Sequence, residues 1–316
     1  MHTPSIREID IERDASDLVA LSREVTPTAL VNVASFLHRM RTVPERSQAQ
    51  AWVAEDNGHA IGRVDCFLSL FAPESRIAEL RVTVRGDHRG RGIGSELYDV
   101  GLAHADAIGA EQLIAHFYEN DAGVAFAAKR GFEQVRAETA SAVDPRLVRD
   151  APPASIDLRP LTTADPRLAY EVDMEATADM PATEPFEGMA YEEWEDHVLR
   201  HPLFVPEGSF VALVNGDAAA VSLIVSEPET GRASSMFTGT RRAYRGRGLA
   251  RAAKLASFRW AAANGVTSML TYNDATNAAM LAVNVRLGYE PLGRNVEWLK
   301  RRAGTAFSQE PRVPAT

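Results

Sequence analysis

The sequence contains almost no cysteine and no long hydrophobic run. Cys66 is the single cysteine among 316 residues, which excludes an intrachain disulfide and a CxxC metal motif. It lies in the strand-like segment RVDCFLSL, where a small buried hydrophobic residue is a more natural interpretation than a nucleophile. No segment approaches about 18 consecutive apolar residues, so no transmembrane helix is expected.

Positive charge and metal-ligand spacing are scarce as well. The chain has 34 basic and 43 acidic residues, and the net charge of −9 argues against nucleic acid as the main partner, because phosphate backbones are bound by clustered positive charge. The eight histidines lack HExxH spacing, and we expect no metal. No signal-peptide pattern is visible, so we expect a soluble, cytoplasmic protein. The length and the 45% hydrophobic content favour two domains.

Two glycine-rich segments are near copies of each other. Residues 82–96 read VTVRGDHRGRGIGSE, and residues 238–252 read TGTRRAYRGRGLARA. In each copy a β-rich run leads through Arg-Gly-Arg-Gly into a helix-forming segment, so the turn falls at a helix N-terminus, where free N–H groups and the helix dipole attract anions. Small residues let a diphosphate approach the backbone, and arginines add charged donors. We predict diphosphate sites at Arg89, Gly90, Arg91, Gly92 and Gly94, and at Arg245, Gly246, Arg247, Gly248 and Ala250.

The motif in both turns differs from two familiar phosphate loops. Neither copy has the Lys-Ser/Thr pair of a Walker A loop or the G-x-G-x-x-G of a dinucleotide site. Both read Arg-x-x-Gly-x-Gly/Ala, and in this they resemble the GNAT superfamily of acyl-CoA-dependent N-acyltransferases, whose motif A holds the pyrophosphate of coenzyme A. The resemblance implies an α/β fold with a mixed sheet, in which two central parallel strands splay apart around acyl-CoA. It also implies that pantetheine pairs with Val82 and Val84, or with Thr238 and Thr240.

The similarity extends beyond the turns. Residues 85–94 and 241–250 share five identities in ten positions, and the hairpin signals at residues 56–58 and 215–217 also recur. We therefore expect a tandem duplication of GNAT-like domains, an arrangement that resembles mycothiol synthases. The expected domains are residues 1–145 and 155–302, with a proline-containing linker at 140–155 and a flexible tail at 303–316.

The resemblance implies a general acid on the helix that follows the fifth strand, where many members have a tyrosine. This sequence has Ala127 and Asn284 at that position, so neither copy has the usual acid. Asn284 becomes a candidate hydrogen-bond partner for the CoA arm. Asn120 and Asn277 are candidate pantetheine contacts, and a helix N-cap is the alternative for Asn277.

Two further residues are candidates for catalysis. Glu79 lies on the first motif A strand, where some members of the family have a catalytic glutamate, and a solvent-facing strand position is the alternative. Tyr272 ends the strand that should splay from the second motif A strand, where it suits an acid or orienting role. Packing is the alternative for an aromatic residue at a strand end.

One segment is strongly acidic. Residues 171–196 contain ten acidic residues, Glu184 among them, and no Lys or Arg. In the family this region forms the wall of the acceptor site, so the resemblance implies that these carboxylates attract an ammonium substrate, with one of them acting as base. The alternative is a solvated helix face, with acidic residues at the start of a helix near Tyr191.

These patterns together predict an N-acetyltransferase that uses acetyl-CoA and a small-molecule primary amine in a ternary complex, as a monomer or homodimer. The acidic segment, Tyr272 and Asp274 favour catalysis in the C-terminal domain, the N-terminal domain being structural or degenerate. Two alternatives stay open. One is a non-catalytic acyl-CoA-binding or regulatory protein, and the other is catalysis in the N-terminal domain with Glu79 as base.

Overall fold

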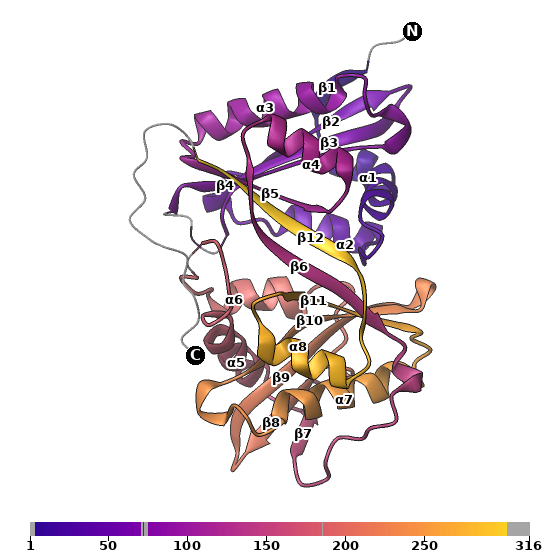
Figure 1. Ribbon diagram of the computed structural model, residues 1–316, viewed down its shortest axis with the longest axis vertical. Coiled ribbons are helices and arrows are strands. Elements are labelled where there is room, and N and C mark those ends of the chain that lie inside the picture. Colours follow the sequence, from indigo (N-terminus) through magenta and orange to yellow (C-terminus); the bar gives the residue numbers. More distant parts are fainter. Residues whose placement is uncertain (1–3, 71, 73–74, 185, 302–316) are drawn as a thin grey trace. The chain divides into compact units, whose positions relative to one another are not determined.

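The computed structural model describes residues 4–70, 72, 75–184 and 186–301 and divides into two compact units (Figure 1). Among these residues, the first unit holds those up to 137, residues 183 and 184, and residues 294–301. The second unit holds residues 138–182 and 186–293. The predicted tail at 303–316 lies outside the described residues. No helix in the described part of the chain is long and apolar enough to cross a membrane.

The first unit is a mixed sheet with helices on both faces. Its strands lie in the order β1-β2-β3-β4-β5-β12, and only the β4–β5 pair is parallel. The helices are α1 (Ile11–Val25), α2 (Val33–Arg41), α3 (Ile93–Ala107) and α4 (Asp121–Lys129). The strands are β1 (Ser5–Glu8), β2 (Gln50–Asp56), β3 (His59–Leu68), β4 (Ile77–Val84), β5 (Gln112–Tyr118) and β12 (Glu290–Arg301).

Alternation along the strands explains this layering. Neighbouring residues of a strand point to opposite faces, so Ala54 packs in the core beneath α3 while Val53 packs beneath α1 and α2. The predicted hairpin between β2 and β3 is confirmed. Its turn residues Asn57 and Gly58 have φ values of 51° and 83°, the left-handed conformation that a two-residue hairpin turn requires.

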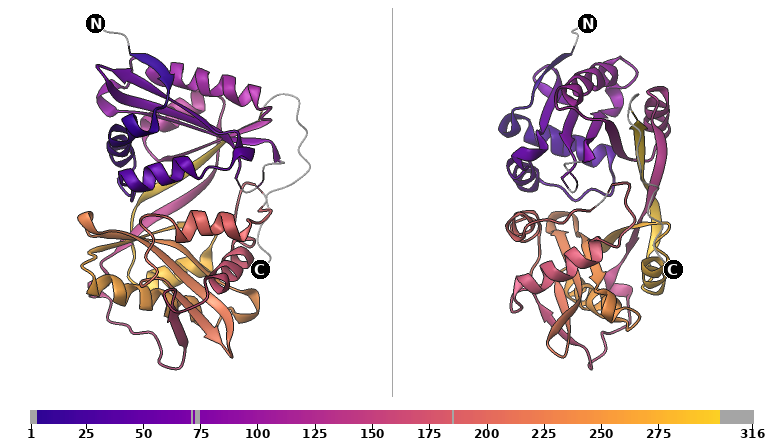
Figure 2. Two further views of the ribbon diagram at one scale, coloured as in Figure 1. Left: turned by 180° about the vertical axis from the view of Figure 1, so that it is seen from behind. Right: turned by 90° about the vertical axis from the view of Figure 1, so that its left-hand side faces the viewer.

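The second unit repeats the plan, and Figure 2 shows its helices on both sides of the strands. The strand order is β7-β8-β9-β10-β11-β6, and the parallel pair is β10–β11. The helices are α5 (Pro166–Thr177), α6 (Tyr191–Trp194), α7 (Leu249–Ala263) and α8 (Ala278–Arg286). The strands are β6 (Glu133–Val143), β7 (Asp157–Pro160), β8 (Phe210–Val214), β9 (Asp217–Glu227), β10 (Arg232–Thr240) and β11 (Ser268–Asp274). The mixed α/β fold and the duplication predicted from the sequence are thereby confirmed.

Each unit is completed by a strand from the other half of the chain. Residues 295–301 of β12, yellow in Figure 1, pair with β5, and residues 138–143 of β6 pair with β11. The compact units therefore differ from the expected domains, because residues 294–301 belong to the first unit and residues 138–145 to the second. The predicted linker is wrong at its start, since residues 140–143 continue β6 and the strand ends only before Pro145.

Candidate active site

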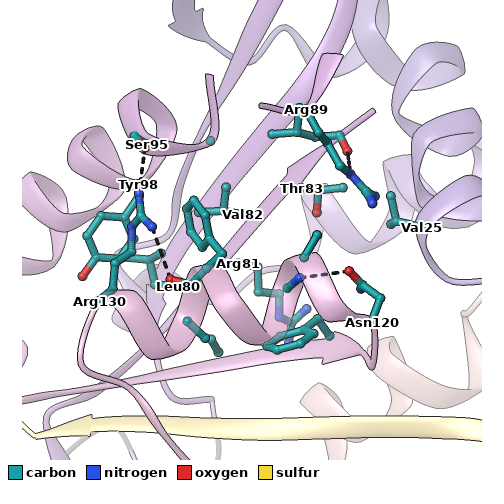
Figure 3. Close-up of a pocket in the computed structure, with 18 of the residues that line it drawn as sticks. Val25, Leu80, Arg81, Val82, Thr83, Arg89, Ser95, Tyr98, Asn120 and Arg130 are labelled. Atoms are coloured by element: carbon teal, nitrogen blue, oxygen red, sulfur yellow. Dashed lines mark hydrogen bonds between the residues drawn. The ribbon is translucent and has the colours of Figure 1, made fainter. Parts of the chain in front are cut away.

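The candidate site begins where β4 and β5 stop pairing. Residues 77–79 of β4 pair with residues 112–114 of β5, and no pairing between the two strands follows in this fully described stretch. Beyond it the strands diverge, and a cavity of about 440 Å³ opens between them (Figure 3). Residues 80–84 and 115–118 line the cavity together with parts of α3 and α4. The first unit thus contains the splayed parallel pair that the motif predicts.

The first glycine turn borders this cavity. Gly90 and Gly92 have φ values of 75° and 88°, in the left-handed region that glycine enters without steric cost. Gly92 is the N-cap residue of α3, and no side chain caps the helix there. The N–H groups of the first helical turn are therefore available to an anion, which the helix dipole also favours.

Two arginines on the cavity wall have no carboxylate partner among the described residues. Arg89 Nε donates to the carbonyl oxygen of Val84 at 3.0 Å, and Arg130 Nη2 donates to Ser95 Oγ at 2.8 Å (Figure 3). The guanidinium carbon of Arg130 also lies 3.4 Å from the centre of the Phe126 ring. Both positive charges are thus uncompensated beside an open helix N-terminus, which suits a diphosphate.

The second glycine turn has the same backbone and a different charge environment. Gly246 and Gly248 have φ values of 77° and 74°, and Gly248 is the N-cap residue of α7. Here Asp179 accepts hydrogen bonds from Arg245 at 2.6 Å and from Arg242 at 2.7 Å. The bond from Arg242 and then that from Arg245 lower the pKa of Asp179 to about 2. The second anion site therefore already holds a counter-ion from its own chain.

The region between β10 and β11 contains a buried lysine. Lys254 corresponds in position to Tyr98, which lines the cavity of the first unit. Only 1% of Lys254 is exposed, and its Nζ donates to Asn284 Oδ1 at 3.1 Å and lies 5.0 Å from the centre of the Tyr289 ring. Asn284 donates in turn to Asn273. Burial lowers the pKa of Lys254 to about 7. Lys254 and Asn284, hydrogen-bonded to each other, thus replace Tyr98 and Ala127 of the first unit's cavity wall.

The predicted second-copy residues have these structural roles. Asn277 caps α8 by accepting from the Met280 N–H at 3.2 Å, which is the alternative considered for it. Asn284 is engaged with Lys254, and Tyr272 lies on β11 opposite Ala140. The hydroxyl of Thr238 on β10 is buried without a hydrogen-bond partner. The residues predicted in the second turn are Arg245, Gly246, Arg247, Gly248 and Ala250. The first four lie between β10, which ends at Thr240, and α7, and Ala250 lies in the first turn of α7.

The predicted first-copy residues gather around the cavity, Arg91 excepted. Those that line it are Val82, Val84, Arg89, Gly90, Gly92, Gly94 and Asn120. Asn120 also caps α4 by accepting from the Gly123 N–H at 2.9 Å. Arg91 donates instead to the carbonyl oxygen of Asp87 at 2.8 Å. The sequence motifs did not identify the lining residues Tyr98, His116, Phe126 and Arg130. The sequence offered one signal for them, namely that Arg130 directly precedes Gly131, a glycine that recurs in the second copy.

Glu79 lies beside the cavity, at the last position of β4 that pairs with β5. Its Oε2 atom accepts a hydrogen bond from Arg81 and lies 4.0 Å from His116 Nε2. Arg81 and His116 both line the cavity. The Glu79 side chain is 13% exposed, so the solvent-facing alternative is wrong. A carboxylate is thus held beside an imidazole where the two strands separate.

Glu184 belongs to the first unit, contrary to the expected acidic wall of the second. It forms a side-chain hydrogen bond with Ser69 and lies within electrostatic range of Glu79 and Glu297. Burial raises the pKa of Glu184 to about 7. The expectation failed because it assumed that the whole acidic segment stays with its own half of the chain. Asp179 from the same segment instead pairs with the second turn.

Comparisons with known proteins agree with this geometry. Residues 22–132 and 170–289 match the model of the acetyltransferase (GNAT) family. A tandem GNAT protein from the clavulanic acid biosynthesis pathway has a TM-score of 0.72 at 20% identity, over 96% of this chain and 100% of its own. A GCN5-related N-acetyltransferase from Sphaerobacter thermophilus has a TM-score of 0.70 at 20% identity, over 96% and 98%. No protein among the curated ones matches this sequence. The structural likenesses support the fold of the whole chain.

Proposed function

Because the chain belongs to the acetyltransferase (GNAT) family, we propose that it transfers the acetyl group of acetyl-CoA to a primary amine of a small molecule, and that the first unit carries out the reaction. The observation that supports this choice of unit is the cavity between β4 and β5, which borders an uncapped helix N-terminus and is lined by Arg81 and His116, the neighbours of the Glu79 carboxylate. The second unit has the same turn, but there Arg245 is already paired with the carboxylate of Asp179. Its role is proposed to be structural.

The proposal assigns separate parts of the cosubstrate to separate parts of the cavity. The diphosphate would accept from the first N–H groups of α3, with Arg89 and Arg130 as charged donors. The pantetheine arm would pass Val82 and Val84 and bring the thioester to the point where the strands separate. Acetyl-CoA supplies the activated acyl group, and the chain holds it in place for attack.

Glu79 is the proposed general base. It lies at the separation point, and His116 lies 4.0 Å from its carboxylate, close enough to interact with it electrostatically. The neutral amine attacks the thioester carbonyl, strand amides stabilise the oxyanion, and the collapse of the tetrahedral intermediate expels the CoA thiolate. Alkyl thiols have a pKa of about 8.5, so the thiolate leaves without a dedicated acid. This is consistent with Ala127 at the position where a tyrosine acid was expected.

Calorimetry and a thiol-release assay test the proposal together. We expect one acetyl-CoA per chain, turnover with at least one member of a panel of primary amines, and loss of both in Gly92→Glu, because its carboxylate would occupy the diphosphate site. Gly248→Glu is the matched control, since its glycine has a similar φ at the second turn, and it should bind as the unmodified protein does. Loss of binding in Gly248→Glu alone would move the site to the second unit. Binding without turnover on any amine would favour a regulatory protein.

A further inference from the structure

Three carboxyl groups of the first unit lie close enough to one another to interact electrostatically, beside the cavity. Glu79 lies 4.0 Å from His116 Nε2, and Glu297 on β12 lies 3.8 Å from His116 Nδ1. Glu184, the third, lies within electrostatic range of both. Because His116 also lines the cavity, the cluster borders the space proposed for the thioester through this residue.

Two carboxyl oxygens of this cluster are buried without a hydrogen-bond partner. They are Glu184 Oε2 and Glu297 Oε1. Only 7% of the Glu297 side chain is exposed, so solvent reaches it poorly. A buried acceptor that lacks a donor is destabilising, and more so when the group is charged. These two oxygens are therefore placed to accept from a ligand that brings N–H donors.

The three carboxyl groups of the cluster differ in whether an arginine is hydrogen-bonded to them. Arg81 donates to Glu79, and Arg136 Nη1 donates to Glu297 Oε2 at 3.3 Å. Within the described part of the chain, Glu184 is hydrogen-bonded to the Ser69 side chain and interacts electrostatically with the two other carboxylates. Burial raises the pKa of Glu184 to about 7, as expected for a carboxyl group without a cation beside it. One positive charge is thus missing from the site.

We propose that the acceptor is an aliphatic diamine or polyamine, whose distal ammonium binds between Glu184 and Glu297 while its other amine attacks the thioester beside Glu79. The inference rests on the proposed function and specifies the substrate class of the same site. The reacting amine must be neutral, so it is not the group that supplies the missing charge. An alkylammonium has three N–H donors, which satisfies both unpartnered oxygens with one donor to spare.

A pair of acceptors that differ by one amino group tests the inference. With 1,4-diaminobutane and n-butylamine, we expect kcat/KM to favour the diamine by about tenfold or more, the factor that one charge-assisted hydrogen bond supplies. Glu184→Gln should remove this preference by raising KM for the diamine and should leave the Kd of acetyl-CoA unchanged. Glu187→Gln is the matched control, because Glu187 is an exposed acid of the same segment. It should keep the preference.

Failure of the proposed function and failure of the diamine inference give different experimental results. If acetyl-CoA does not bind, the proposed function is wrong, and direct calorimetric titration of 1,4-diaminobutane into the protein and into Glu184→Gln still tests the carboxylate site. If acetyl-CoA binds and the diamine has no advantage over n-butylamine in turnover or in titration, the inference is wrong. An equal loss for both amines in Glu184→Gln would also overturn it, because a purely structural role affects both.

Discussion

The first and second glycine turns both start their helices with a left-handed glycine, but their arginines differ in whether a carboxylate neutralises them. Arg89 donates only to a carbonyl oxygen, whereas Arg245 is paired with Asp179. Beside the first turn stands Arg130, and the corresponding residue in the second copy is Leu287. A duplicated motif therefore conserves the shape of an anion site more readily than its charge, and charge decides whether an anion binds.

The regions between the two parallel strands, β4 and β5 in the first unit and β10 and β11 in the second, also differ. In the first unit the separated strands enclose a cavity of about 440 Å³. In the second, Lys254 and Asn284 form a buried hydrogen bond in the corresponding place. The two units thus differ in the polar character of this region as well as in the charge of their turns. Three predictions test how far this contrast extends.

The largest expected effect comes from removing the free guanidinium groups. In the double variant Arg89→Ala, Arg130→Leu, each lost charged hydrogen bond costs about 1.5–3 kcal/mol, so the Kd of acetyl-CoA should rise by at least about 100-fold. Isothermal titration calorimetry measures this. Arg130→Leu also reproduces the residue of the second copy.

Arg245→Ala provides the control, and its Kd should stay within about twofold, because an arginine already paired with a carboxylate contributes little to anion binding. Equal weakening by the two sets of substitutions would show that both turns bind the cosubstrate. The contrast between the units would then fail.

The sequence predicted most of the fold and one half of the site. The turns, the hairpins and the duplication follow from local rules, since glycine with positive φ and period-2 alternation are properties of short segments. The exchange of residues 294–301 and 138–143 between the units was missed, because nothing in a strand's own sequence states which edge it will pair with. The same holds for the β-bulge that the register shows between Ser235 and Phe237.

The charge states were missed for a related reason. The acidic segment was visible, but the pairing of Asp179 with Arg245 joins residues 66 positions apart, and the place of Glu184 in the first unit depends on contacts with residues far from it in the sequence. Composition identifies carboxylates and cannot assign their partners. Lys254 likewise has an ordinary helical position in the sequence, and only packing makes it a buried amine.

A smaller effect is expected for the pH dependence of stability. The pKa of Lys254 is lowered to about 7 by burial, while the unfolded chain keeps a lysine pKa near about 10.4. Between these values the unfolded state binds a proton that the native state does not, so this group makes the free energy of unfolding rise with pH from about 7 to about 10. Lys254→Met lacks this contribution. Denaturant unfolding at pH 7, 8 and 9 should give a difference between the two proteins that grows with pH in favour of the unmodified chain. A constant difference would show that Lys254 stays charged in the fold.

The smallest effect is expected from removing the carboxylate that neutralises the arginines of the second turn. Asp179→Asn removes the carboxylate from Arg242 and Arg245 while keeping the size of the side chain, so the turn regains its positive charge. Because the substitution changes only the turn, the probe is inorganic pyrophosphate rather than acetyl-CoA. We expect Asp179→Asn to bind pyrophosphate at a second, weak site, with an affinity less than about tenfold above that of the unmodified second turn. The free energy of unfolding should change by about 0–1 kcal/mol, as for partly exposed ion pairs. Absence of a second site in Asp179→Asn would show that Asp179 is not what closes the second turn to anions, and the difference between the copies would then have to lie in Arg130 and Leu287.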